Sequence, residues 1–157
     1  MSKDPIAIFM AQHEEGLAHL RELGGYIQRV ERGEVTEEVL EGVRGATAFI
    51  NNEVRAHNEK EEELLFPELE KVLPPKGPTF VMREEHRRLW EVLEKVEGTL
   101  ERLEGDKDGA VIDELVASAQ FVVQLLSEHI NKENSVLYPM ARQLLAPEQM
   151  AAIAQRM

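Results

Sequence analysis

The chain has 157 residues and a formal net charge of −12, from 18 Lys and Arg against 30 Asp and Glu, with five His and no Cys. A single domain spanning residues 1–157 is the default at this length, and 43% hydrophobic residues suffice for one core. An acidic chain without a basic block argues against nucleic acid or a membrane surface as a partner, because such binding comes largely from Lys and Arg. The lack of Cys excludes disulfides, thiolate catalysis and Cys-ligated metals. Any metal site must therefore use His and carboxylates.

The N-terminal residues, Met1 to Phe9, lack the apolar core of a signal peptide, and we expect no membrane-spanning stretch. A cytoplasmic protein is the resulting expectation. Proline, glycine and capping residues divide the chain into four long helical segments and a tail. The expected segments are residues 5–33, 36–73, 79–104, 109–139 and 148–155.

Apolar residues recur in these segments at alternating spacings of four and three, which is typical of the inner face of near-antiparallel packed helices. The expected inward positions include Met10 in the first segment, Glu53 in the second and Val136 in the fourth. With short connections, the pattern predicts an all-α fold, an up-down-up-down antiparallel four-helix bundle with a short C-terminal helix. The bundle core spans about residues 5–145.

An internal repeat relates the two halves of the chain. Residues 57–67 align without gaps with residues 129–139, an offset of 72, and His13 relates to His86 at an offset of 73. The sequence therefore predicts two helical hairpins of similar design.

Four of the five His fall on inward positions: His13, His57, His86 and His129. In an antiparallel bundle the starts of the first and third segments share an end with the finishes of the second and fourth. At a rise of about 1.5 Å per residue, all four imidazoles then lie at one level, roughly 10–15 Å from that end. The fifth, His19, lies about 120° from the His13 face and is expected at the surface or its boundary.

Two carboxylates are expected in the same layer. Glu61 follows His57 by four residues and Glu133 follows His129 by four, so each pair shares a helix face. Buried anionic Glu side chains are costly without cations, which favours a metal site, although Glu61 could instead lie on the solvated face among its acidic neighbours. Imidazole and carboxylate without sulfur suit Fe, Mn or Zn, and two ions bridged by carboxylates would use six ligands economically. The Glu-x-x-His and His-Glu-x-x-His motifs of other metal sites are absent.

These residues resemble the hemerythrin-like (HHE cation-binding) domain family. The resemblance rests on His13, His57-x-x-x-Glu61 with Phe66-Pro67, His86, and His129-x-x-x-Glu133 with Tyr138-Pro139, and it covers about residues 5–145. It implies a left-handed bundle with two non-haem, carboxylate-bridged Fe ions. By this resemblance His13 and His57 ligate one iron, His86 and His129 ligate the other, and Glu61 and Glu133 bridge them.

Two departures from oxygen-carrying hemerythrins argue against reversible oxygen carriage. Trp90 stands four residues after His86, where those proteins have a further His, and Glu133 replaces a carboxylate placed five residues after the fourth-helix His. A coordination position is thereby left for water, oxygen, peroxide or NO, or for another side chain, and Trp90 could limit access to it. Glu53, one turn before His57, is expected to orient that His or to bind metal directly, or else to be a surface residue of a long acidic helix.

The sequence therefore predicts a cytoplasmic di-iron protein that binds or senses oxygen, peroxide or NO, or handles iron. An enzyme that decomposes peroxide or NO with the same centre is an alternative. A haem-binding bundle with two axial His, or a structural bundle whose polar layer fixes register, are further alternatives. The small ligand, the native metal and protein partners remain open at this point.

Overall fold

The structure is a computed structural model that describes residues 4–157, in which every regular element is a helix, so the all-α prediction is confirmed. The second and fourth of the four long arms contain π-helical segments, labelled η, between their α-helical parts. The first arm is α1 (Pro5–Glu31); the second comprises α2 (Glu37–Phe49), η1 (Ile50–Val54), α3 (Arg55–Lys60), η2 (Glu61–Leu65) and α4 (Phe66–Glu70). The third is α5 (Pro78–Gly105), the fourth comprises α6 (Gly109–Lys132), η3 (Glu133–Leu137) and α7 (Tyr138–Leu144), and α8 (Pro147–Arg156) follows.

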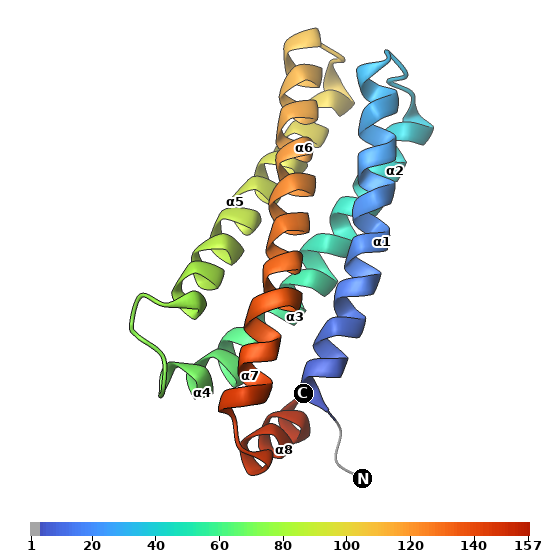
Figure 1. Ribbon diagram of the computed structural model, residues 1–157. Helices are drawn as coiled ribbons and strands as arrows, with labels where there is room; N and C mark the ends of the chain where they lie inside the picture. The colour runs from blue at the N-terminus through green and yellow to red at the C-terminus, as the bar shows by residue number, and fades with distance from the viewer. Residues whose placement is uncertain (1–3) are drawn as a thin grey trace.

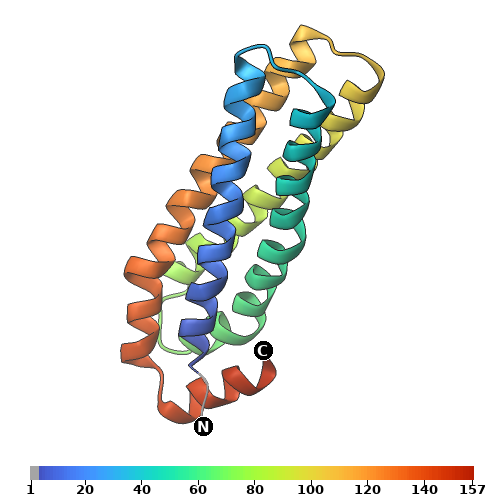
Figure 2. The same cartoon turned by 90° about the vertical axis from the view of Figure 1, so that its right-hand side faces the viewer.

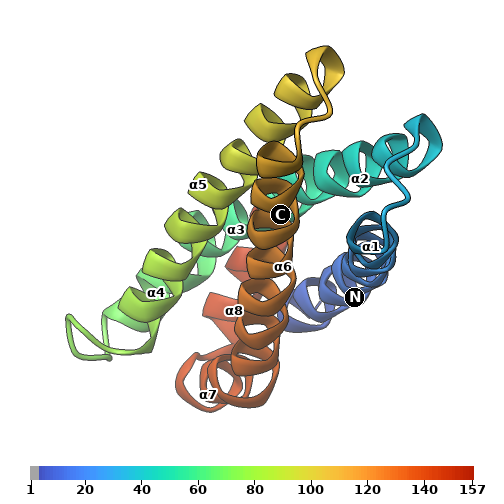
Figure 3. The ribbon, with the colours of Figure 1, turned by 90° about the horizontal axis from the view of Figure 1, so that it is seen from above.

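Successive arms run in opposite directions along the molecule (Figure 1). The α1 helix packs against α2 and α6, and α5 packs against the same two. Seen from above, α6 lies between α5 on one side and α1 on the other (Figure 3). The short α8 folds back beneath the lower end of the bundle, beside the start of α1 (Figure 2), and buries Ile153 there. This arrangement brings the starts of α1 and α5 to the end where α4 and α7 finish.

Helix boundaries follow from the capping residues that the sequence indicated. The side chains of Asp4, Thr36 and Asp108 accept hydrogen bonds from backbone N–H groups at the starts of α1, α2 and α6. Gly33, at φ +93°, follows the end of α1 in the left-handed region that favours glycine. The predicted lack of a signal peptide concerns a segment that starts at Met1, and residues 1–3 of it lie outside the described part.

A polar layer divides the hydrophobic core into two clusters. The upper cluster includes Leu20 and Ile27 of α1 and the residues of the other arms that pack around them. The lower cluster includes Ile6, Phe9 and Phe66 and other residues around α4, α7 and α8. His13 lies between the two clusters along α1, and the buried His and Glu of the other arms lie at corresponding points. The level of this layer along the bundle is set by the sequence spacing described above.

Three positions expected to face inward, Val136, Glu53 and Met10, are exposed, and π segments account for the first two. In the fourth arm η3 adds a residue to the turn, so Val136 is 52% exposed and Leu137 takes the inward position. In the second arm η1 leaves Glu53 exposed and buries Val54 instead. Met10 is also exposed, for a different reason: the inward face of α1 runs through Phe9, which gives a better apolar contact at the lower end.

Proline explains the position of two of these turns. Pro67 and Pro139 each follow a π segment by two residues and stand at the start of α4 and α7. A proline lacks the N–H that would bond four residues back and its ring crowds that carbonyl, so a wider turn before it relieves the clash.

By length and composition alone, the continuous helical run Gly109–Leu144 could cross a membrane, although the sequence analysis expected no such stretch. This is weak evidence, because the core helix of a globular protein passes the same test. In this fold Leu115 and Val122 pack in the upper cluster, and the run also carries buried His129 and Glu133 into the polar layer.

Candidate metal centre

The polar layer brings together all six residues that the sequence analysis put forward as metal ligands. Each is at most 5% exposed, and the two glutamates are fully buried; they are His13, His57, Glu61, His86, His129 and Glu133. Their ligand atoms form two groups of four, in each of which the atoms lie within 4.8 Å of one another. Glu61 and Glu133 belong to both groups, while each group has its own pair of His. That sharing is the arrangement the resemblance implies, and metal ligation itself stays a prediction.

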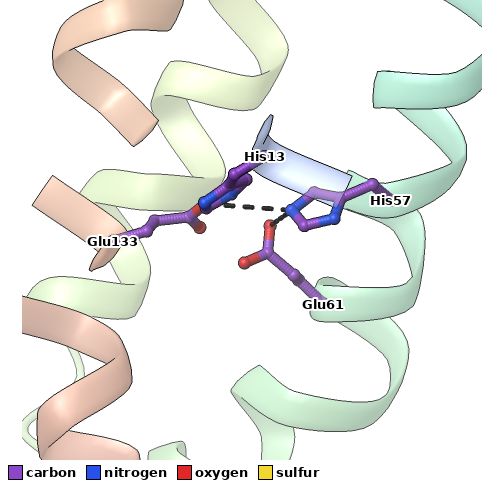
Figure 4. Close-up of side chains that lie close together, drawn as sticks. All are labelled: His13, His57, Glu61 and Glu133. Atoms are coloured by element: carbon purple, nitrogen blue, oxygen red, sulfur yellow. Dashed lines mark hydrogen bonds and ion pairs between the residues drawn. The ribbon is translucent and has the colours of Figure 1, made fainter. Parts of the chain in front are cut away.

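The imidazole Nε2 atoms point at the carboxylates. Nε2 of His13 lies 2.9 Å from Glu133 Oε1, and Nε2 of His57 lies 3.2 Å from Glu61 Oε1. Figure 4 shows these four side chains converging from opposite sides of the bundle. On the other side, Nε2 of His129 lies 3.3 Å from Glu133 Oε1. The cluster is therefore compact enough for each carboxylate to reach both halves.

Every imidazole in the cluster also forms a hydrogen bond from its outer nitrogen, Nδ1, to an oxygen of another helix. The acceptors are Asn134 for His13, Gln12 for His57, Glu62 for His86 and Glu85 for His129, at 2.6 to 2.9 Å. Because Nδ1 donates outward, the neutral tautomer leaves a lone pair on each Nε2, directed inward. A metal-binding His typically has this arrangement. Metal ions in this layer would satisfy these four lone pairs.

Unsatisfied atoms in the layer support the same conclusion. Glu61 Oε1 and Glu133 Oε2 are buried and accept no hydrogen bond within the described chain. Nε2 of His86 lies 3.0 Å from Nε2 of His129, so two atoms that would each ligate metal face one another. Buried polar atoms without partners are costly, and cations would satisfy them. The donor set therefore fits two hard or borderline metal ions.

The carboxylates shift the pKa values of the imidazoles upward in the metal-free protein. Burial alone would lower the pKa of His57, but Glu61 and Glu133 outweigh it and raise the pKa to about 9. Burial is likewise outweighed at His129, where Glu133 is the main partner and the pKa rises to about 10. Burial would raise the pKa of Glu133, but the charge of His129 and the nearby imidazoles of His13 and His57 hold it well below its usual value. Metal ions entering this layer would have to displace protons.

Tyr138 is a member of the cluster that the sequence analysis named only as part of the Tyr138-Pro139 motif. Its hydroxyl donates to Glu61 Oε2 at 2.7 Å and lies 3.2 Å from Nε2 of His13. Its ring stacks on that of His13 with centroids 5.2 Å apart. The signal was present in the repeat, because Tyr138 aligns with Phe66 and a hydroxyl is the difference between them.

Other residues named from sequence lie around the centre. Glu53 is exposed and belongs to neither group of ligand atoms, so its expected inward position is wrong, although it borders the cavity described below. Trp90 is half-buried, with its ring 6.1 Å from that of His86 and its indole N–H without a partner in the described chain. His19 lies apart from the cluster and is half-buried, in agreement with the predicted boundary position. Its ring stacks on that of Phe49.

A cavity of about 460 Å³ borders one side of the cluster. Its lining includes exposed residues such as Glu15 and Lys60 together with the buried His13, His57 and His129. The cavity therefore connects the surface with the polar layer and has room for water or a small ligand.

Fold and site together define a helical bundle with a buried His and carboxylate centre suited to metal. Comparison with known families then names the group: the family model described as Hemerythrin HHE cation binding domain matches residues 4–141. The chain belongs to the hemerythrin HHE cation-binding domain family.

Similar curated proteins carry the name iron-sulfur cluster repair protein YtfE. Those of Enterobacter sp. (strain 638), Escherichia coli (strain SMS-3-5 / SECEC) and Escherichia fergusonii are each 28% identical to this chain over 138 residues. The match covers 85% of this chain and 63% of each relative, so it leaves more than a third of each relative unmatched.

Proposed function

We propose that this protein binds two non-haem iron ions in the polar layer, one held by His13 and His57 and the other by His86 and His129, with Glu61 and Glu133 bridging. One observation carries the proposal: all four outer nitrogens donate to other helices, while the four Nε2 atoms converge on two carboxylates that each retain a free oxygen. Mn or Zn would suit the same donors, and the family and its iron-related relatives favour Fe.

The role we propose for this centre is iron handling, or reaction with a small ligand such as oxygen, peroxide or NO. The printed name of the relatives, iron–sulfur cluster repair, supports iron handling. The cavity beside His13 and His57 supports access by a small ligand. Bound iron would supply redox chemistry and open coordination positions, while the chain holds the ligand atoms in place and limits water. A cytoplasmic setting is part of the proposal and is consistent with the acidic charge.

Metal analysis of protein freshly purified from iron-supplied cells tests the binding. We expect two iron ions per chain and an oxo-to-iron charge-transfer absorption. Both should be lost in the double variant His57→Ala/His129→Ala, which removes a ligand from each pair. The variant His19→Ala is the matched control and should retain both ions, because His19 lies outside the cluster. Protein that contains no iron and takes none up would contradict the proposal.

An enzymatic role has one supporting observation, the Tyr138 hydroxyl held at the edge of the cluster on the side of His13. Steady-state decomposition of peroxide or NO, well above the rate of free iron, would establish it. A haem bundle is disfavoured because two buried carboxylates face the imidazoles, and a Soret band would contradict that judgement. A purely structural layer predicts a melting temperature that does not change on chelation, whereas a buried metal site makes stability depend on the ion.

A further inference from the structure

The two pairs of His differ in what accepts their outer hydrogen bonds. Neutral amide oxygens, of Gln12 and Asn134, accept from the His13/His57 pair at 2.6 and 2.7 Å. Carboxylate oxygens, of Glu62 and Glu85, accept from the other pair, as set out above. We call the first the amide-backed pair and the second, His86 with His129, the carboxylate-backed pair.

The internal repeat makes this a difference between corresponding positions. Glu62 and Asn134 each stand five residues after a His, at the repeat offset of 72. Gln12 and Glu85 each stand one residue before a His, at the offset of 73. Each acceptor crosses to a His of another helix in the same way. The scaffold is therefore shared, and the charge of the acceptor is what changes between the pairs.

Basic side chains keep the two outer carboxylates in ionic surroundings. The Lys132 ammonium forms an ion pair with Glu85. Arg83 lies 3.6 Å from Glu62 and also donates to the backbone carbonyl of Glu62 at 3.2 Å, while its main partner is the carboxylate of Glu70. These contacts anchor both carboxylates in position beside the imidazoles.

An anionic acceptor draws the Nδ1 proton more strongly than an amide does and makes Nε2 a better electron donor to a cation. Changing such a partner typically alters metal affinity about 10–100-fold. The two outer anions also add favourable electrostatic energy for an ion on their side, in a layer with little screening.

We propose that the two metal positions are unequal: the carboxylate-backed pair retains its ion, and the amide-backed pair holds an ion that exchanges. This inference rests on the proposed di-iron function and deepens it. The outer acceptors Glu62, Glu85, Gln12 and Asn134 are the positioning residues that set the difference.

The cavity lies beside the amide-backed pair, whose ion is the one expected to exchange. Gln12, His13 and His57 all border it, whereas His86, Glu62 and Glu85 do not. Water or a chelator therefore reaches the amide-backed pair directly. His129 is the one ligand of the carboxylate-backed pair in the lining, so that pair is approached from one side only.

Release kinetics test the inference without any assay of turnover. Protein is loaded anaerobically with two equivalents of Fe(II), and excess ferrozine, a colour-forming Fe(II) chelator, is then added. We expect two phases of one ion each, with rate constants that differ at least about tenfold. Glu62→Gln and Glu85→Gln should each speed the slow phase alone, and Gln12→Glu and Asn134→Asp should each slow the fast phase alone.

The matched control is Glu84→Gln, which removes a carboxylate next to Glu85 that pairs with Arg87 and contacts no His. It should leave both phases unchanged, and a merely structural effect of losing charge on α5 would show there. If Glu85→Gln unfolds the chain, the variants Gln12→Glu and Asn134→Asp still test the inference through the fast phase. Release of both ions in one phase, or an effect of Glu85→Gln on the fast phase, overturns this inference and leaves the di-iron proposal standing. Failure to take up two equivalents of Fe(II) overturns both.

Discussion

The two halves of the cluster can be compared ring by ring. Phe66 stacks on His86 with centroids 5.8 Å apart and ring planes at 13°, and Tyr138 stacks on His13 at 5.2 Å and 19°. The frame is the same, yet only one of these rings carries a hydroxyl, and it bonds to Glu61. The comparison teaches that the repeat fixes where the ligands stand, whereas single residues at corresponding positions give each half its own chemistry.

The largest expected effect comes from a residue that both halves share. Glu133→Gln should remove both iron ions, because Glu133 belongs to both groups of ligand atoms. His13→Ala, which touches one group, should remove one ion and leave the other. Iron content per chain measures both. Glu128→Gln, on the exposed face of the same helix, is the control and should retain two ions. Retention of both ions by Glu133→Gln would break the predicted sharing.

The next largest effect is expected on stability, at two apolar positions that correspond in the internal repeat. Leu64 aligns with Val136, and each lies in a π segment, η2 and η3, but Leu64 is 4% exposed and Val136 is 52% exposed. Leu64→Ala should lower the free energy of unfolding of the metal-free protein by about 2–5 kcal/mol. Val136→Ala should change it by less than about 0.5 kcal/mol. Urea denaturation of both variants checks this. Equal losses of unfolding free energy would contradict the difference in burial between the two positions.

Removing the hydroxyl makes the two stacked rings alike. Tyr138→Phe deprives Glu61 of its donor and should destabilise the metal-free protein by about 1.5–3 kcal/mol, the range for hydrogen bonds to charged groups. Chemical denaturation at neutral pH measures it. Tyr26→Phe, a half-buried tyrosine of α1 outside the cluster, is the control and should cost less than about 0.5 kcal/mol. An equal loss in the control would assign the effect to general packing.

The smallest difference concerns two His at corresponding positions of the repeat. In the metal-free protein the pKa is about 9 for His57 and about 10 for His129, both above the ordinary 6.5. Because folding raises these pKa values, their contribution to stability is complete below pH 6.5 and is lost as the pH rises through 9 and 10. NMR titration should show both imidazoles losing their protons well above pH 6.5, and denaturation should show stability falling over that range. Stability that rises there would contradict the carboxylate contacts.

Much of the fold and all six candidate ligands could be predicted from sequence, since caps and spacing are local. His13 and His86 fall at the same depth because helix rise is nearly constant, and the structure brings both into one layer. The register beyond Glu133 could not be predicted in this way. A π turn adds one residue to a turn in response to packing and to Pro139, and α-helical periodicity carries no mark of it.

The outer acceptors show a different limit of sequence reasoning. Glu62 and Asn134 correspond in the alignment of the repeat. Both have charged or polar neighbours in the sequence, a pattern that is equally typical of a solvent-exposed helix face. Only the rotation of one helix against another decides that these side chains reach a His. The sequence pattern could therefore locate the candidate ligands but not the residues that accept their outer hydrogen bonds.

The polar layer that separates the two apolar clusters has a consequence for cooperativity of unfolding. Each apolar cluster is packed separately from the other. In the metal-free state, the layer between them is held by ion pairs such as that of His13 with Glu133. Ions bound across all four arms would tie both ends into one unit. Without them we expect the lower end, with α8, to open as a separate unit at lower free energy, and its amides to exchange with solvent first. Iron supply would then govern how much of this chain a cellular protease can reach.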